Sequence, residues 1–331
     1  MKKGLLLLLF TTFIACYACS QAEEKVESLP TVYFTEEISP ESLIAIFDAL
    51  GVEPVGNVCV KISTGEGGNT HYLKPALIGD FVKKINGTLV ECGTAYGGTR
   101  QDPAKHWETI REHGFLDIAK VDLMDEFGDM KIPVRDTTHI KYDIVGEHLK
   151  DYDFMVNLAH FKGHAMGGYG GVLKNASIGV ASTNGKAYIH SAGKQETADG
   201  LWANIPPQDL FIESMGAAAQ AVHDYMNAKA DDGKPRVVYI NIMNNMSVDC
   251  DCSSHPAAPL MKDMGIAASL DPVAVDQACL DMVFSHVSTE GDDSAPMIER
   301  ITTRHGEYLP PYSEKIGLGS TKYNLVNIKK Q

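Results

Sequence analysis

The sequence predicts an α/β fold in which a mainly parallel sheet is flanked by helices in Rossmann-like layers. Short apolar segments of strand length alternate with longer amphipathic segments, a pattern typical of parallel strands joined by crossover helices. Hydrophobic residues make up 44% of the chain and charged residues 22%, which suits a substantial core. We expect residues 31–328 to form one α/β unit, with a division at about residue 150 as the alternative.

Helix boundaries in the first half are marked by capping residues. Ser39 and Asp102 each precede a proline, and such pairs supply an N-cap and a first helical residue. Glycines close the helices. The elements that we expect here are a strand at 32–34, a helix at 40–50, a strand at 58–62, a helix at 75–87, a strand at 88–92, a helix at 103–113, a strand at 121–124 and a hairpin around 132–134.

The same alternation returns in the second half. We expect a strand at 154–158, a helix at 208–228, a strand at 237–242 and a helix at 272–284, which Asp271 and Pro272 begin. In the helix at 208–228 the apolar residues recur with the helical period of 3.6, and we expect them to face the core. They are Leu210, Phe211, Met215, Ala218, Ala219, Val222, Tyr225 and Met226.

The N-terminal segment has the pattern of an export signal. Lys2 and Lys3 precede an apolar stretch at 5–14 that is too short to span a bilayer. The sequence that ends at Cys16 resembles a bacterial lipobox, and Cys19 is a second candidate for lipidation. We therefore expect a signal peptide at 1–16, a tether at 17–30 and a protein that is exported and anchored to the membrane of the cell envelope by its lipid.

The overall charge argues against one class of partner. The formal net charge is −14, and so acidic a surface repels the phosphate backbone of nucleic acids. We therefore exclude nucleic acid and expect a small-molecule ligand or substrate.

Unusual residues gather in four loops that each follow a predicted strand. These loops are 64–69, 91–100, 160–174 and 244–255. In an open parallel sheet, ligands bind beyond the carboxyl ends of the strands. We therefore expect the four loops to meet at one edge of the sheet and to form a single functional site.

The loop at 160–174 supplies candidate catalytic groups. We assign catalytic roles to His160, Lys162, His164 and Lys174, because imidazoles transfer protons near neutral pH and lysines neutralise anions. Surface histidines and solvated lysines in an ordinary strand–loop–helix connection are the alternative. A glycine-rich loop can aim several N–H groups at one ligand atom, and we assign cofactor binding to Gly167, Gly168, Gly170, Gly171, Thr94 and Tyr96.

The loop at 244–255 supplies candidate metal ligands. Cys250 and Cys252 are flanked by aspartates, and thiolates favour zinc, copper(I) or iron–sulfur centres. We expect a transition metal or an iron–sulfur cluster bound by Cys250, Cys252, Asp249 and His190, the last of which follows a predicted strand or turn. His160 or His164 could complete the ligand shell in place of His190. A polar loop with turn-forming aspartates and free or disulfide-bonded cysteines is the alternative.

Several segments resemble the domain-of-unknown-function family 362. They are residues 94–98, 160–175, 185–193, 248–252, 268–279 and 316–320, and the resemblance covers roughly residues 31–328. It implies a bacterial and archaeal family that is sometimes fused to ferredoxin-type iron–sulfur modules and has no settled activity. This chain carries an export signal and differs from the fused members in that respect. Residues 170–174 are also similar to the glycine-lysine loop of nickel-pincer lactate racemases.

Three functions fit these features. The first is a metal- or iron–sulfur-dependent redox enzyme that acts on a small molecule and exchanges electrons with a redox partner. The second is a metal- or cofactor-dependent isomerase or racemase of a small acid, with histidines as general acid and base. The third is a lipoprotein that binds a ligand without chemistry.

Overall fold

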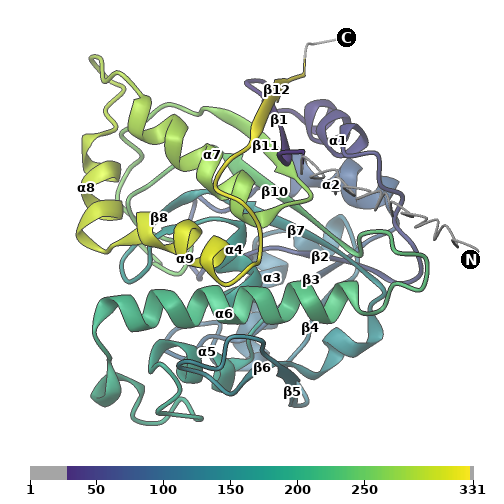
Figure 1. Cartoon of the computed structure of the whole chain (residues 1–331), viewed down its shortest axis with the longest axis vertical. Helices are drawn as coiled ribbons and strands as arrows, with labels where there is room; N and C mark the ends of the chain where they lie inside the picture. Colours follow the sequence, from purple (N-terminus) through teal and green to yellow (C-terminus); the bar gives the residue numbers. More distant parts are fainter. Residues whose placement is uncertain (1–27, 329–331) are drawn as a thin grey trace, which may run out of the picture.

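The centre of the protein is an eight-stranded, mostly parallel sheet (Figure 1). This computed structural model describes residues 28–328. The strand order is β12-β1-β11-β10-β7-β2-β3-β4, and only β11 runs antiparallel to its neighbours. The strands are β1 (Thr31–Thr35), β2 (Val58–Lys61), β3 (Thr88–Glu91), β4 (Val121–Leu123), β7 (Phe154–His160), β10 (Val237–Met243), β11 (Gly265–Ser269) and β12 (Asn324–Asn327). The predicted α/β fold is confirmed.

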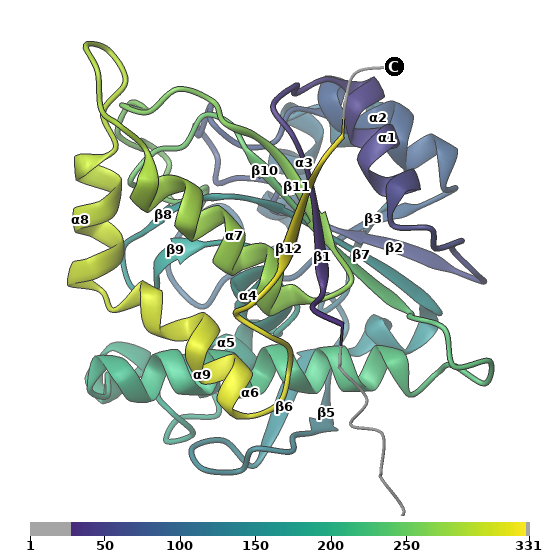
Figure 2. The same ribbon diagram turned by 45° about the horizontal axis from the view of Figure 1, so that its top comes forward.

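Helices cover both faces of the sheet, as Figure 2 shows. One face carries α1 (Pro40–Ala49), α2 (Pro75–Lys84) and α3 (Pro103–Glu112), and the other carries α5 (Thr183–His190), α6 (Gln208–Asn227) and α7 (Pro272–Ser285). Successive residues of β7 point into the two cores in turn: Val156 packs with the first group of helices and Met155 with the second. A strand buried on both faces is therefore apolar at nearly every position.

The predicted caps are present. The Ser39 side chain accepts a hydrogen bond from Ser42 N, Asp102 accepts one from Lys105 N, and Asp271 accepts from Val273 N and Ala274 N. The predicted hairpin around 132–134 is also present, as the antiparallel pair of β5 (Asp129–Pro133) and β6 (Tyr142–Gly146). The remaining elements are β8 (Lys162–His164), β9 (Gly168–Gly170), α4 (Val172–Lys174), α8 (Ala295–Thr303), α9 (Leu309–Lys315), the 3-10 helices η1 (Phe115–Asp117), η2 (Glu147–Asp151), η4 (Leu201–Asn204) and η5 (Gly306–Tyr308), and the π-helix η3 (Asn175–Gly179).

Three local expectations were wrong. His160 and His164 are not loop residues: His160 ends β7, and His164 ends β8, which pairs with β9 in a short hairpin. His190 does not follow a strand or turn, because it ends helix α5. The Ser182 side chain caps that helix by accepting a hydrogen bond from Gly185 N.

The path of the chain through the sheet creates a crevice. From β2 the chain continues to β3 and β4, and it then returns to β7 on the other side of β2. In open α/β sheets, ligands bind where the strand order reverses in this way.

The predicted signal peptide, Cys16 and most of the tether lie outside the described residues. Within residues 28–328, no helix combines the length and the hydrophobicity that crossing a bilayer requires.

Candidate functional site

A cavity of about 350 Å³ lies at the carboxyl ends of β2, β3 and β7. Its wall includes Ser63 after β2, Thr94 after β3, His160 at the end of β7 and Cys250 in the loop after β10. The cavity therefore gathers segments that lie almost 200 positions apart in the chain. Three of the four predicted loops contribute to its wall, whereas no residue of 64–69 does. Its volume is at the lower end of the range for small-molecule sites, roughly 300–1,000 Å³.

Asp251 connects the loop after β10, which carries Cys250 and Cys252, to the end of strand β7. One carboxylate oxygen lies 2.9 Å from His160 Nδ1, and the other lies 2.6 Å from Lys162 Nζ. All three side chains are buried. Burial opposes ionisation of Asp251, but the charges of His160 and Lys162 outweigh it and hold the pKa of this carboxyl well below its usual range. The backbone adds a further link, because Glu66 N donates to Asp251 O at 2.7 Å.

These contacts change the roles that the sequence predicted for His160 and Lys162. His160 has oxygen atoms at both ring nitrogens, since Nε2 also lies 2.5 Å from Asn244 O. Neither nitrogen is left to exchange a proton with a ligand, although the ring forms part of the cavity wall. Lys162 is neutralised by Asp251. We therefore assign both residues to positioning in place of catalysis.

His164, Cys250 and Cys252 form a compact group of soft ligands. One potential ligand atom from each residue lies within 4.8 Å of the other two. A shared hydrogen bond with Cys252 lowers the pKa of Cys250 well below its usual value, and Lys174 and His164 act in the same direction against burial. The same hydrogen bond raises the pKa of Cys252 well above its usual value. The cationic setting therefore favours the thiolate form of Cys250, which is the form that binds metals.

The ring orientation of His164 is set by the β8–β9 hairpin. Its Nδ1 accepts hydrogen bonds from Gly167 N at 2.8 Å and from Met166 N at 3.2 Å. Burial and the neighbouring Lys174 lower the pKa of His164, so the ring is neutral at pH 7. Because Nδ1 accepts, the ring proton is on Nε2 in this arrangement.

The other two predicted metal ligands stand apart from this group. Asp249 pairs with Arg300 at 3.3 Å and accepts a hydrogen bond from Ala257 N at 2.9 Å, and it is not part of the cavity wall. His190 does reach the cavity, with its Nδ1 donating to Lys186 O at 2.6 Å. Burial lowers the pKa of His190 to about 3. We remove Asp249 from the ligand set and place His190 in the cavity wall.

The end of the glycine cluster packs against a protein carboxylate, that of Asp276. Asp276 accepts hydrogen bonds from Val172 N at 2.9 Å and from Leu173 N at 3.0 Å. A Cβ on Gly171 would lie 2.4 Å from the same carboxylate. The N–H groups that follow the glycines therefore donate to the Asp276 carboxylate. Burial raises the pKa of Asp276 to about 6. The predicted role of the four glycines in cofactor binding stays a prediction.

The four predicted glycines have different positions. Gly170 and Gly171 line the cavity, together with Thr94 and Tyr96. Gly167 lies in the turn between β8 and β9, and Gly168 begins β9. Gly168 has a φ of 78°, and a Cβ there would lie 2.8 Å from the Cα of Gly306, so close backbone packing explains this glycine.

A buried ionic network, which the sequence analysis did not identify, supports the opposite wall. Glu91 pairs with Lys61 at 3.2 Å and with Arg100 at 3.3 Å, and Arg100 also pairs with Glu66 at 3.4 Å. Arg100 Nη2 donates to the Tyr96 hydroxyl at 3.2 Å and so holds that ring in the cavity wall. The one signal in the sequence is that Lys61 and Glu91 are charged residues at the ends of apolar strands.

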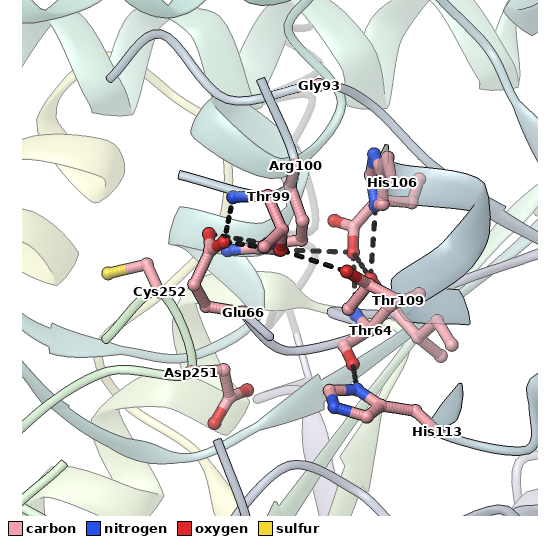
Figure 3. Close-up of polar contacts among 12 residues, drawn as sticks. Thr64, Glu66, Gly93, Thr99, Arg100, His106, Thr109, His113, Asp251 and Cys252 are labelled. Carbon is pink, nitrogen blue, oxygen red and sulfur yellow. Dashed lines mark hydrogen bonds and ion pairs between the residues drawn. The ribbon is translucent and has the colours of Figure 1, made fainter. Parts of the chain in front are cut away.

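Loop 64–69 belongs to the same network, as Figure 3 shows. Thr64 donates to Glu91 through its backbone N at 2.6 Å and through its hydroxyl at 2.8 Å. Its carbonyl oxygen lies 2.7 Å from His113 Nδ1, and its hydroxyl lies 3.2 Å from His106 Nε2. Burial lowers the pKa of His106 to about 4, so this histidine is neutral. The network therefore joins the loops after β2 and β3 into one rigid wall.

Fold and cavity together define an α/β protein with a cavity at the switch point of its sheet. The family model described as "Domain of unknown function (DUF362)" matches residues 58–281, and the chain belongs to this family. No curated protein matches the chain.

Two solved structures resemble the fold. The lactate racemase apoprotein from Thermoanaerobacterium thermosaccharolyticum is 12% identical, with a TM-score of 0.40, over 76% of this chain and 56% of that one. A Thermotoga maritima protein from a structural genomics programme is 13% identical, with a TM-score of 0.42, over 75% of this chain and 59% of that one. The chain thus spans less than two thirds of the length of either protein.

Proposed function

We propose that this protein is an enzyme that binds one transition-metal ion through His164, Cys250 and Cys252 and acts on a small molecule in the adjoining cavity. The observation that carries the proposal is the distance of 4.8 Å or less between the three ligand atoms. Three protein ligands leave one position of a tetrahedral ion open, which is the pattern of catalytic and not of structural zinc sites. Such an ion would act as a Lewis acid or, if redox-active, as an electron carrier.

A single ion fits the donor set better than an iron–sulfur cluster. Clusters take four protein ligands, usually cysteines. Cys92 lines the cavity, but its thiol donates to Val180 O at 3.3 Å, and burial raises its pKa strongly. Cys59 and Cys279 are buried in the core around β2 and α7. Among the described cysteines, only Cys250 and Cys252 join the proposed ligand group.

Metal analysis of the anaerobically purified full-length chain tests the proposal. We expect about one transition-metal ion per chain in the wild type. We expect it to be lost in Cys250→Ser and His164→Ala and kept in Asp249→Asn, the matched control from the same loop. Background metal in the wild type, or equal metal in Cys250→Ser, would overturn the proposal.

One observation favours a second function, a metal-independent isomerase or racemase of a small acid. Because Nδ1 of His164 accepts from Gly167 N, the neutral ring carries its proton on Nε2 and can donate a hydrogen bond from it. The adjacent Cys250 thiolate would remove the proton next to a carboxylate and, as the thiol, return it. The His164 ring would meanwhile donate its hydrogen bond to the oxygen on which negative charge develops.

Deuterium exchange distinguishes this second function from the first. Small 2-hydroxy and 2-amino acids are incubated in D₂O with the protein and a chelator. The isomerase proposal predicts exchange at the α-carbon that persists with chelator and disappears in His164→Ala. Exchange that the chelator abolishes would favour the metal enzyme, and no exchange with any of these acids would overturn the isomerase.

We also propose that the chain is exported and lipid-anchored through Cys16. The basic and apolar pattern before this residue supports the proposal. Cell fractionation tests it: the wild type and Cys19→Ala are expected in the membrane fraction, and Cys16→Ala is expected to be released. Membrane association of Cys16→Ala equal to that of the wild type would contradict it.

A further inference from the structure

We propose that the substrate carries an anionic oxygen group, a carboxylate or a phosphate, and that Lys174 and Lys186 bind this group. The inference rests on the proposed function only in placing the substrate in this cavity, and it does not depend on the metal. It names the class of substrate and adds Lys186, to which the sequence analysis gave no role.

Five cationic side chains line this one cavity in a chain whose net charge is −14. They are Lys61, Arg100, Lys162, Lys174 and Lys186. Three of them have a carboxylate partner within the protein: Lys61 pairs with Glu91, Arg100 with Glu66 and Glu91, and Lys162 with Asp251. These three are neutralised by the protein itself, and their role is to hold the loops.

The other two cations have no such partner. Lys186 is buried in helix α5, and the contact of its ammonium is a hydrogen bond to the backbone oxygen of Ala181 at 2.5 Å. The Lys174 ammonium makes no hydrogen bond or ion pair with the residues that the structure describes. The ammonium of Lys186 is therefore buried without a counter-ion, which is costly, and functional sites keep such groups because a ligand completes them. Lys174 is only partly buried. Burial lowers the pKa of Lys186, which is consistent with an unfilled environment.

The two lysines stand close to the proposed reaction centre. Lys174 lies beside Gly170, where its Cδ is 3.6 Å from the position of an added Cβ, and its charge lowers the pKa of Cys250. Lys174 and Lys186 both lower the pKa of His190, which ends helix α5 and lines the same cavity. An anionic group at these lysines would therefore place the rest of a small molecule next to Cys250.

The remaining wall limits the size and polarity of that molecule. Ala95, Ile178, Leu201 and Trp202 supply an apolar surface to the same cavity of about 350 Å³. The cavity therefore fits a short molecule with one anionic end and an apolar body, and it does not fit a nucleotide-sized ligand without rearrangement.

Trp202 provides a direct optical probe for binding. The chain has two tryptophans, and the second, Trp107 in α3, donates to Glu126 and is not part of the cavity wall. In a Trp107→Phe background, fluorescence reports on Trp202 alone. The titrants are malonate, inorganic phosphate and the neutral control malonamide, at constant ionic strength.

The inference predicts a saturable fluorescence change with malonate, with phosphate or with both, and none with malonamide. The Kd is expected to rise at least about tenfold in Lys174→Met and in Lys186→Met, which keep the apolar part of the side chain, and to stay within about twofold in Lys194→Met. Lys194 is exposed just after α5 and serves as the matched control. A response to malonate alone would indicate a carboxylate substrate, and a response to phosphate alone would indicate a phosphate substrate.

Several results would overturn the inference. These are equal responses to malonamide and malonate, no saturable response to either anion, or equal weakening by Lys194→Met. Lys174 has no partner to lose, so Lys174→Met tests the idea even if Lys186→Met fails to fold. Metal content is measured on the same samples. If the protein binds the anion but holds no metal, this inference is supported and the metal proposal is contradicted. If the protein holds metal but binds neither anion, the metal proposal is supported and this inference is contradicted.

Discussion

Substitution of Asp251 by asparagine probes the contact that assembles the site. The side chain is 1% exposed, and its two oxygens face His160 at 2.9 Å and Lys162 at 2.6 Å. Asparagine keeps the shape but leaves Lys162 buried without its counter-ion. Removing one partner of a buried ion pair costs about 3–5 kcal/mol. This is a large part of the roughly 5–15 kcal/mol that stabilises an ordinary domain.

Urea unfolding at pH 7, followed by circular dichroism, measures this cost. The matched control is Asp249→Asn, two residues earlier in the same loop, whose partner Arg300 is a quarter exposed. An exposed pair of this kind contributes about 0–1 kcal/mol. Equal losses in the two variants, or a loss below about 1 kcal/mol in Asp251→Asn, would refute the anchoring role. Because the pKa of Asp251 is lowered on folding, its stabilisation is present above the unfolded pKa of about 4 and declines as the pH falls below it.

Two further predictions concern other buried positions. Burial raises the pKa of Asp143 from 3.8 to about 7. Between these two values the unfolded chain releases the proton and the folded protein keeps it, so the protein loses about 4 kcal/mol of stability between pH 4 and pH 7 through this group and loses no more above pH 7. Asp143→Asn should flatten that part of the curve of unfolding free energy against pH, and an unchanged curve would contradict the assignment. Gly171→Ala places a Cβ 2.4 Å from Asp276 and should cost about 1–3 kcal/mol in urea unfolding. Gly97→Ala, whose Cβ meets nothing within 4 Å, should be close to neutral, and equal costs would contradict the close-approach argument.

Local sequence signals predicted the layers of the fold well, because the chemistry that ends and begins its elements is local. Ser39, Asp102 and Asp271 cap their helices in the structure as the sequence indicated. The edge strand β12 had no such signal. It is exposed along its length and is held by pairing with β1, almost 300 residues earlier, so only tertiary structure defines it.

The sequence predicted where the site lies better than it predicted which residues contact one another there. The rule that ligands bind beyond the carboxyl ends of parallel strands brought Cys250, His164 and Thr94 to one cavity. The sequence did not distinguish Asp249 from Asp251, which flank the same cysteine. The hydrogen bond from Glu66 N to Asp251 O fixes how the loop lies, and that contact spans 185 positions.

Buried lysines show the same limit. Lys186 lies on a short helix whose residues from Gly185 to His190 are all buried, so no amphipathic pattern separates a core position from a site position. Lys61 pairs with Glu91, whereas Lys186 has no carboxylate partner among residues 28–328, and this difference is a property of the fold.

X-ray absorption at the edge of the bound metal tests the central claim most directly, because it identifies the ligand atoms. The proposed centre predicts two sulfur neighbours, at about 2.3 Å if the ion is zinc, together with at least one nitrogen neighbour. Cys250→Ser should reduce the sulfur shell, and Asp249→Asn should leave the spectrum unchanged. A shell of only oxygen and nitrogen, or a sulfur shell that survives in Cys250→Ser, would show that the metal does not bind at His164, Cys250 and Cys252.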